Sequence, residues 1–296
     1  MNILRLPKGE EEDEVLFAYD NINKFQKKIN TELIIFLNVL YFIIYMEKTK
    51  EAKKEDFKLD TEEMAQAGLH FGHRTSRVHP KMKPYLFGVR NAVHIIDLEK
   101  TAEKLKEALN FIQQLISENK VLLLAGTKIQ AKDLVKSTAK ECGLPYVSER
   151  WLGGTFTNFE TIKKRIDYFK DLERKKAEGE LEKYTKKERA DIDKELRTLE
   201  LKVGGIKNLI KLPEAIFVLD MKKDELAIKE AKRKGVKVIA IADTNTDPTL
   251  VDYPIPANDD AISSLKYILE KVGEVIKKSK PKSEQPLEIQ NPEPKI

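Results

Sequence analysis

Three short apolar runs separated by helical patterns constrain the fold of this chain more than any other feature. VLLLAGT (121–127), AIFVLD (215–220) and VKVIAIAD (236–243) do not alternate with polar residues, which is typical of parallel strands buried on both faces. Helical patterns follow the first run over 129–143 and the second over 224–235. Because strands that alternate with helices form βαβ units, we predict an α/β fold with helices on both faces of a parallel sheet.

Other segments complete this α/β domain, which we place at residues 46–158 and 204–278. Asp60 or Thr61 can cap a short helix over 61–70, because both side chains accept hydrogen bonds from a first helical turn. We predict strands at 93–98 and 146–151, and helices at 101–119 and 259–278.

The segment between the two halves of this domain has a different pattern. Two narrow apolar seams recur at spacings of three and four, namely Phe159, Ile162, Ile166 and Phe169, then Ile192, Leu196, Leu199 and Val203. Within each seam the intervening residues are charged or polar apart from Leu201, and Thr185 with Glu188 can form a capping box for the second helix. We therefore predict an antiparallel coiled-coil hairpin inserted at residues 159–203.

The two ends of the chain differ from this domain. The apolar run LIIFLNVLYFIIY (33–45) has thirteen residues, whereas a membrane span needs about 20, so we predict no membrane association. Residues 1–45 are an atypical extension, and we expect Met46 to be the working initiator; a short hydrophobic anchor or a partner-binding strand is the alternative. The tail at 279–296 is rich in Pro, Glu, Lys and Ser, which predicts disorder.

The most distinctive chemistry lies in a basic segment, which we predict to be a loop over residues 70–91. From residue 64 to residue 96 there is no Asp or Glu, and five Arg and Lys side chains match the net charge of the whole chain, +5. Phe71, Tyr85 and Phe87 are interleaved with these charges, and aromatic and basic side chains together suit the bases and phosphates of RNA. The residues that we predict to face RNA are His73, Arg74, Arg77, Lys81, Lys83, Arg90 and Asn91. A solvated loop is the plainer interpretation.

The motif RWLGGTFTN (150–158) is a second candidate. Arg150, Thr155 and Asn158 have the polar groups that a phosphate needs, so we predict that they also face RNA. The plainer interpretation for Trp151 is packing at the base of the hairpin, and we prefer it.

Four histidines over residues 70–94 also suggest a metal site. His70 and His73 are three residues apart, and Asp243 and Asp247 follow a predicted strand end. However, no cysteine is nearby, and structural zinc sites use four nitrogen or sulfur ligands. Asp, Asn and Pro around 243–248 are also ordinary turn residues. We predict no metal, and interior positions for His70 and His94.

An enzyme on this fold is the main alternative. Doubly wound sheets often bind nucleotides, but the chain lacks GxxxxGK[ST] and GxGxxG, and AGTK (125–128) is too short to cradle a phosphate. We therefore predict no catalytic residues and no cofactor, and keep a cytosolic nucleotide-dependent enzyme as the alternative. The single Cys142 fits a reducing compartment. An RNA-independent interaction protein that uses the hairpin is a third possibility.

Six blocks in series resemble a known family. They are HFGHRTSRVHPKMKPYLFGVRNAVHIIDLEKT, RWLGGTFTN, GGIKNL, LPEAIFVLD, AIKEAKRKGVKVIAIADTNTDP and IPANDDAI. Over about residues 57–278 the chain is similar to bacterial small-subunit ribosomal protein two. The first 45 residues have no counterpart in that pattern.

The resemblance implies a Rossmann-like sheet with an inserted coiled coil, and a structural protein of the cytoplasmic ribosome without catalytic activity. It further implies binding to small-subunit rRNA near the junction of head and body, with support for subunit assembly and translation. The implied protein partners are neighbouring small-subunit proteins, among them the large mRNA-binding protein. The basic segment lies in the block that most closely matches the family.

Overall fold

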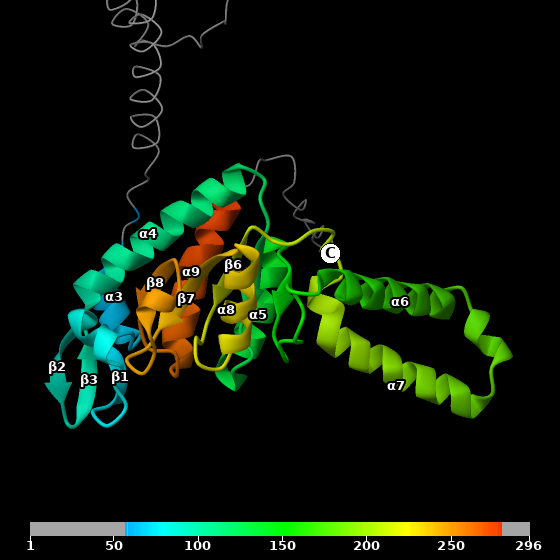
Figure 1. The fold of residues 1–296 in the computed structure, drawn as a ribbon, viewed down its shortest axis with the longest axis horizontal. Helices are drawn as coiled ribbons and strands as arrows, with labels where there is room; N and C mark the ends of the chain where they lie inside the picture. The colour runs from blue at the N-terminus through cyan, green and yellow to red at the C-terminus, as the bar shows by residue number, and fades with distance from the viewer. Residues whose placement is uncertain (1–56, 58, 280–296) are drawn as a thin grey trace, which may run out of the picture. The chain divides into compact units, whose positions relative to one another are not determined.

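The three apolar runs form the central strands of a five-stranded parallel sheet (Figure 1). This computed structural model describes residue 57 and residues 59–279. The strand order is β5-β4-β6-β7-β8, with β4 at Leu122–Ala125, β5 at Tyr146–Val147, β6 at Ala215–Val218, β7 at Lys237–Ala242 and β8 at Tyr253–Pro256. Every neighbouring pair is parallel. The predicted α/β class is therefore confirmed, whereas β8 was not predicted.

Helices lie before, between and after these strands, mostly at the predicted places. They are α3 (Thr61–Gln66), α4 (Leu98–Ser117), α5 (Ile129–Cys142), α6 (Phe159–Ala177), α7 (Lys186–Val203), α8 (Glu225–Lys234) and α9 (Ile262–Ser279). Asp60 caps α3 by accepting a hydrogen bond from the Glu62 amide. Gly143 and Gly235 end α5 and α8 in the left-handed conformation, with φ of 61° and 71°, where a side chain would be strained.

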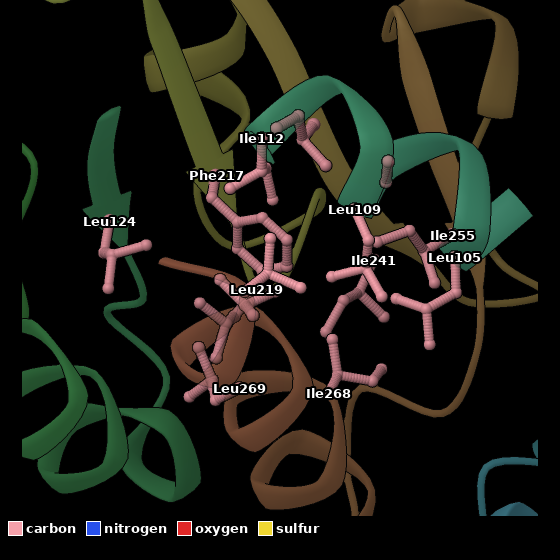
Figure 2. Packing of buried hydrophobic residues seen from close by; sticks show 14 of the residues in the cluster. Leu105, Leu109, Ile112, Leu124, Phe217, Leu219, Ile241, Ile255, Ile268 and Leu269 are labelled. Atoms are coloured by element: carbon pink, nitrogen blue, oxygen red, sulfur yellow. The ribbon is translucent and has the colours of Figure 1, made fainter. Parts of the chain in front are cut away.

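Both faces of the sheet are covered by apolar side chains, as the continuous apolar runs predict. Leu122 and Leu124 point into the larger core with α4, α5 and α9, whereas Leu123 and Ala125 pack on the opposite face with α8. Figure 2 shows the first core, in which side chains from α4 and α9 meet those of the strands; the labelled residues are Leu105, Leu109, Ile112, Leu124, Phe217, Leu219, Ile241, Ile255, Ile268 and Leu269. The sheet is thereby a rigid support for the loops at its edges.

The two helices between β5 and β6 contact each other. Lys176 Nζ donates a hydrogen bond to Asp193 Oδ1 at 2.6 Å, and the Tyr168 hydroxyl donates one to Glu195 Oε2 at 3.3 Å. The side chains of both predicted seams lie in the apolar cluster on the α8 face of the sheet. The capping box of Thr185 with Glu188 is present.

The region around the basic segment differs from its prediction. The prediction of a single loop over residues 70–91 is wrong. The segment instead forms β1 (Phe71–Arg74), a 3₁₀ helix (Pro80–Tyr85) and β2 (Leu86–Arg90). The strand predicted at 93–98 is β3 (Val93–Ile96), but it pairs antiparallel with β1 and β2 in a separate three-stranded sheet. Asn91 and Ala92, with φ of 51° and 60°, make the two-residue turn from β2 to β3.

Some predictions fall on other parts of the chain. Those for residues 1–45, for an initiator at Met46 and for the tail from residue 280 lie outside the described residues, while Ser279 still belongs to α9. Within the described part, none of the helices combines the length and hydropathy needed to cross a bilayer.

Candidate nucleic-acid interface

The basic segment is anchored to the loop that follows β7. The backbone amide of His73 donates to Thr244 Oγ1 at 2.9 Å, and the amide of His79 donates to the Thr244 carbonyl oxygen at 2.7 Å. Gly72 makes this approach possible, since a Cβ there would lie 2.4 Å from the Thr244 methyl carbon. A residue 171 positions away in sequence therefore fixes the orientation of β1.

The His73 ring takes part in the same anchor. Its Nδ1 lies 3.2 Å from Asp243 Oδ2 and its Nε2 lies 3.0 Å from Asn245 Nδ2. The hydrogen bond to Asp243 is the main reason why the pKa of His73 is raised. A ring nitrogen of His73 and oxygens of Asp243 and Asp260 lie within 4.8 Å of one another. The acidic neighbours of this histidine are therefore Asp243 and Asp260, and not Asp247.

Asp247 belongs to a second anchor. Lys81 Nζ donates to Asp247 Oδ2 at 2.7 Å and to Thr249 Oγ1 at 2.8 Å. These bonds join the 3₁₀ helix of the basic segment to the short helix at Pro248–Leu250. The hydrogen bond from Lys81 lowers the pKa of the Asp247 carboxyl group. Lys81 is half exposed and forms a salt bridge with Asp247, so a carboxylate already partly neutralises its charge.

Four other cations of the segment face solvent. Arg74, Arg77, Lys83 and Arg90 are exposed, and among the described carboxylates none forms a salt bridge with them. Asn91 is also exposed, at the turn between β2 and β3. The structure thus separates the predicted set into anchors (His73 and Lys81) and a solvent-facing group (the other five).

The other histidines pack within or beneath the segment. Burial lowers the pKa of His70, whose ring lies 4.0 Å from that of Phe71, centroid to centroid. His94, on β3, has both ring nitrogens buried without a described hydrogen-bond partner. Both residues are only half-buried, and His70 also lines the groove beside Phe71, so the interior places predicted for them are found only in part.

Of the three residues predicted to face RNA in the motif at 150–158, the structure exposes two and buries one. Arg150 and Asn158 are exposed, and Asn158 Oδ1 accepts a hydrogen bond from Thr161 at 2.9 Å. Thr155 is buried, with its hydroxyl donating to the Leu152 carbonyl at 2.6 Å, so it has no surface to offer a phosphate. Trp151 is buried against Phe156 in an edge-on contact, which matches the packing interpretation.

A third group lies where the strand order reverses between β4 and β6, and sequence reasoning missed it. Lys128 Nζ lies 3.2 Å from Asp220 Oδ2, 2.7 Å from Asp259 Oδ1 and 2.8 Å from Asp260 Oδ1. Burial lowers the pKa of Lys128, but hydrogen bonds to Asp259 and Asp260 outweigh burial, so its pKa is raised. Burial, with the charges of Asp243 and Asp220, raises the pKa of Asp259 to about 7.

The carboxylates around Lys128 limit what can bind at the point where the strand order reverses between β4 and β6. Doubly wound sheets often hold phosphates there, but here carboxylates already surround the amine of Lys128. Lys222, Lys223 and Arg77 line the adjoining cavity of about 300 Å³. The basic pair directly after the second apolar run, AIFVLDMKK, was the available signal. Cations from the basic segment and from the β6 loop therefore border one depression.

Comparison with known proteins places these features in a family context. The family described as "Ribosomal protein S2" matches residues 64–279. "Small ribosomal subunit protein uS2" of Geotalea uraniireducens (strain Rf4) is 48% identical over 214 residues, which are 72% of this chain and 84% of that protein. The protein of the same name from Dictyoglomus thermophilum (strain ATCC 35947 / DSM 3960 / H-6-12) is 46% identical over 228 residues, 77% of this chain and 93% of that protein.

Proposed function

Because the chain belongs to the ribosomal protein S2 family, we propose that the solvent-facing cations of its basic segment bind phosphates of small-subunit rRNA. The protein is a structural component of the small subunit in the cytoplasmic ribosome and is not an enzyme. It lies there with rRNA and other ribosomal proteins. The enzyme alternative has no support from the relatives.

One observation carries the proposal for the basic segment. Arg74, Arg77, Lys83 and Arg90 are exposed on a scaffold that the Thr244 contacts hold in place, in a stretch without Asp or Glu. Exposed cations that are not neutralised by neighbouring carboxylates gain most from phosphates, because binding releases counterions from the RNA. Arg150 and Asn158 join this proposal as exposed polar groups, whereas Thr155 does not.

The finer placement in the subunit is part of the same proposal. We place the bound rRNA near the junction of head and body, as the resemblance to the family implies. We also propose that α6 and α7 form an inserted coiled coil that meets a neighbouring protein, including the large mRNA-binding one. The side-by-side contacts of α6 with α7 and the half-exposed Tyr168 on α6 support this role.

Gradient sedimentation of a cell lysate tests the rRNA proposal. The protein should move with small subunits at low salt and leave them at high salt. Arg74→Ala/Arg77→Ala should reduce this co-migration while circular dichroism shows an intact fold. Lys266→Ala/Lys278→Ala, which removes the same charge from exposed sites on α9, is the matched control. Wild-type protein that stays at the top of the gradient at low salt, while free subunits lack it, would contradict the proposal.

A further inference from the structure

Two phenylalanines on the small antiparallel sheet are unusually exposed. Phe87 on β2 is 82% exposed and Phe71 on β1 is 50% exposed. Both line a groove of about 560 Å³, together with Ile95, Gly88 and Arg90. A single exposed apolar side chain needs no explanation, but two aromatic rings beside one groove indicate a binding surface.

The strand register explains the shape of this groove. Ile95 on β3 pairs with Phe71 on one side and with Gly88 on the other. Residues that pair directly across strands share a sheet face. A Cβ on Gly88 would have no described atom within 4 Å, so the position opposite Ile95 is open space. The groove therefore has an apolar floor and aromatic sides, which suits a flat ring.

Arginines border the same surface. Two residues before Ile95 along β3, Val93 pairs with Arg90 on β2 and with Arg74 on β1. Two residues of a strand cover about 6.8 Å, so a cationic row lies next to the apolar one. Arg90 itself lines the groove.

We propose that this groove is a stacking platform for unpaired bases of RNA, with Phe87 and Phe71 as the stacking rings and Arg90 as the phosphate contact. The inference rests on the proposed rRNA binding and deepens it by naming the kind of RNA. Aromatic side chains stack only on bases that are not already stacked in a duplex, so the ligand is single-stranded, as in a loop, bulge or end.

Charge favours RNA over an apolar protein segment as the occupant. The stretch from residue 64 to residue 96, which supplies all three strands, has five Arg and Lys side chains and no carboxylate. Four of these cations, all except Lys81, form no salt bridge with a described carboxylate. A groove built only for apolar protein side chains would gain nothing from their charge, whereas the RNA backbone is attracted to it. Stacking and phosphate contacts together are the usual means by which single strands are held.

Fluorescence anisotropy with the full-length protein tests the platform. The probes are a labelled twelve-nucleotide uridine RNA and a twelve-base-pair RNA duplex, each titrated over a salt series. Phe87→Leu keeps an apolar side chain but removes the ring, and it should weaken single-strand binding about fivefold or more without changing the salt slope. Phe87→Trp should retain the affinity. Arg90→Ala should lower the salt slope by about 0.7, the increment for one phosphate on a single strand.

Tyr184→Leu, at an exposed aromatic residue outside α6 and α7, is the matched control and should bind like the wild type. Equal affinity of Phe87→Leu and wild type for the single strand would overturn the platform, and so would an equal loss on the duplex. An apolar protein segment in the groove would tolerate leucine and give that first result. If wild-type protein also fails to sediment with small subunits, the proposed function itself is wrong. If wild-type protein does sediment with them, only the proposed stacking platform is wrong.

Discussion

The Glu230 side chain accepts a hydrogen bond from the backbone amide of Gly154, with 2.7 Å between Oε1 and the nitrogen. Its other oxygen accepts from the amides of Phe156 and Thr157, at 2.9 and 3.3 Å. Glu230 is a buried residue of α8, so one carboxylate satisfies three amides of the loop that leads into α6. Gly154 has a φ of 93°, a conformation that glycine adopts without strain.

Glu230→Gln should therefore destabilise the protein. An amide has one oxygen where the carboxylate has two, so at least one backbone amide loses its acceptor while buried. The expected loss is about 1–3 kcal/mol in the free energy of unfolding, measured by urea denaturation. Glu225→Gln, at an exposed position of the same helix, should change it by less than about 0.5 kcal/mol. Equal midpoints for the two variants would contradict this role of Glu230.

Lys128→Met should lower the free energy of unfolding more than Glu230→Gln does. The amine of Lys128 is close to three carboxylates, and its loss would leave Asp259 buried beside Asp243 and Asp220 without a cation. Removing one partner from a buried ion pair costs about 3–5 kcal/mol. Lys132→Met, one turn further along α5, removes a more exposed pair with Glu149 and should cost about 0–1 kcal/mol. Adding Asp259→Asn to Lys128→Met should restore part of the stability; a further loss would show that the carboxylates are not the cause.

His73 should make the stability depend on pH. Its folded-state pKa is raised above 6.5 by the hydrogen bond to Asp243, so the folded protein holds this proton more tightly than the unfolded chain does. The stabilisation is complete below pH 6.5 and is lost as the pH rises through the folded-state pKa. In urea unfolding curves recorded between pH 6 and 8.5, His73→Gln should show a smaller decline than the wild type. The decline that remains up to about pH 7 comes from the raised pKa of Asp259. A parallel pH dependence in both proteins, or an NMR titration of His73 with a pKa below 6.5, would refute it.

Gly72 offers a steric test of the anchor. Gly72→Ala places a methyl group 2.4 Å from the Thr244 side chain and 3.1 Å from the His94 carbonyl oxygen, and overpacking of this kind costs about 1–3 kcal/mol. Gly88→Ala is the control, because Gly88 lies on β2 of the same sheet and its added methyl group meets open space. Its free energy of unfolding should stay within about 0.5 kcal/mol of the wild-type value. Thermal unfolding of both variants measures the difference. An unchanged melting temperature for Gly72→Ala would mean that β1 can shift away from Thr244 at little cost.

The sequence predicted those elements whose signal is local. Continuous apolar runs identified β4, β6 and β7, and left-handed glycines ended α5 and α8 where expected. Strand β8 was missed because its sequence, YPIP, has two prolines, which cannot donate to a strand partner. Strands β1 and β2 were missed because exposed Arg and Phe residues hide the alternation of a small two-sided sheet.

The candidate interface was predictable in composition but not in detail. A stretch without carboxylates can be read from the sequence, so the cations stand out as a group there, and their contact with RNA stays a prediction. Their separate environments depend on distant contacts: Lys81 meets Asp247 across 166 positions, and Thr155 is buried by its own loop. No local pattern specifies such pairs, because many Asp and Lys residues of this chain have equivalent neighbours in sequence.

The anchor on Thr244 also has a consequence for synthesis. The chain is made from its N-terminus, so β1 leaves the ribosome before the residue that holds it, 171 positions later, exists. At roughly 5–20 residues per second, the basic segment waits on the order of 10–30 s for its partner. During that interval a stretch rich in arginine and lysine is unprotected among nucleic acids. A newly made copy therefore has a period in which premature contact with RNA competes with its own folding.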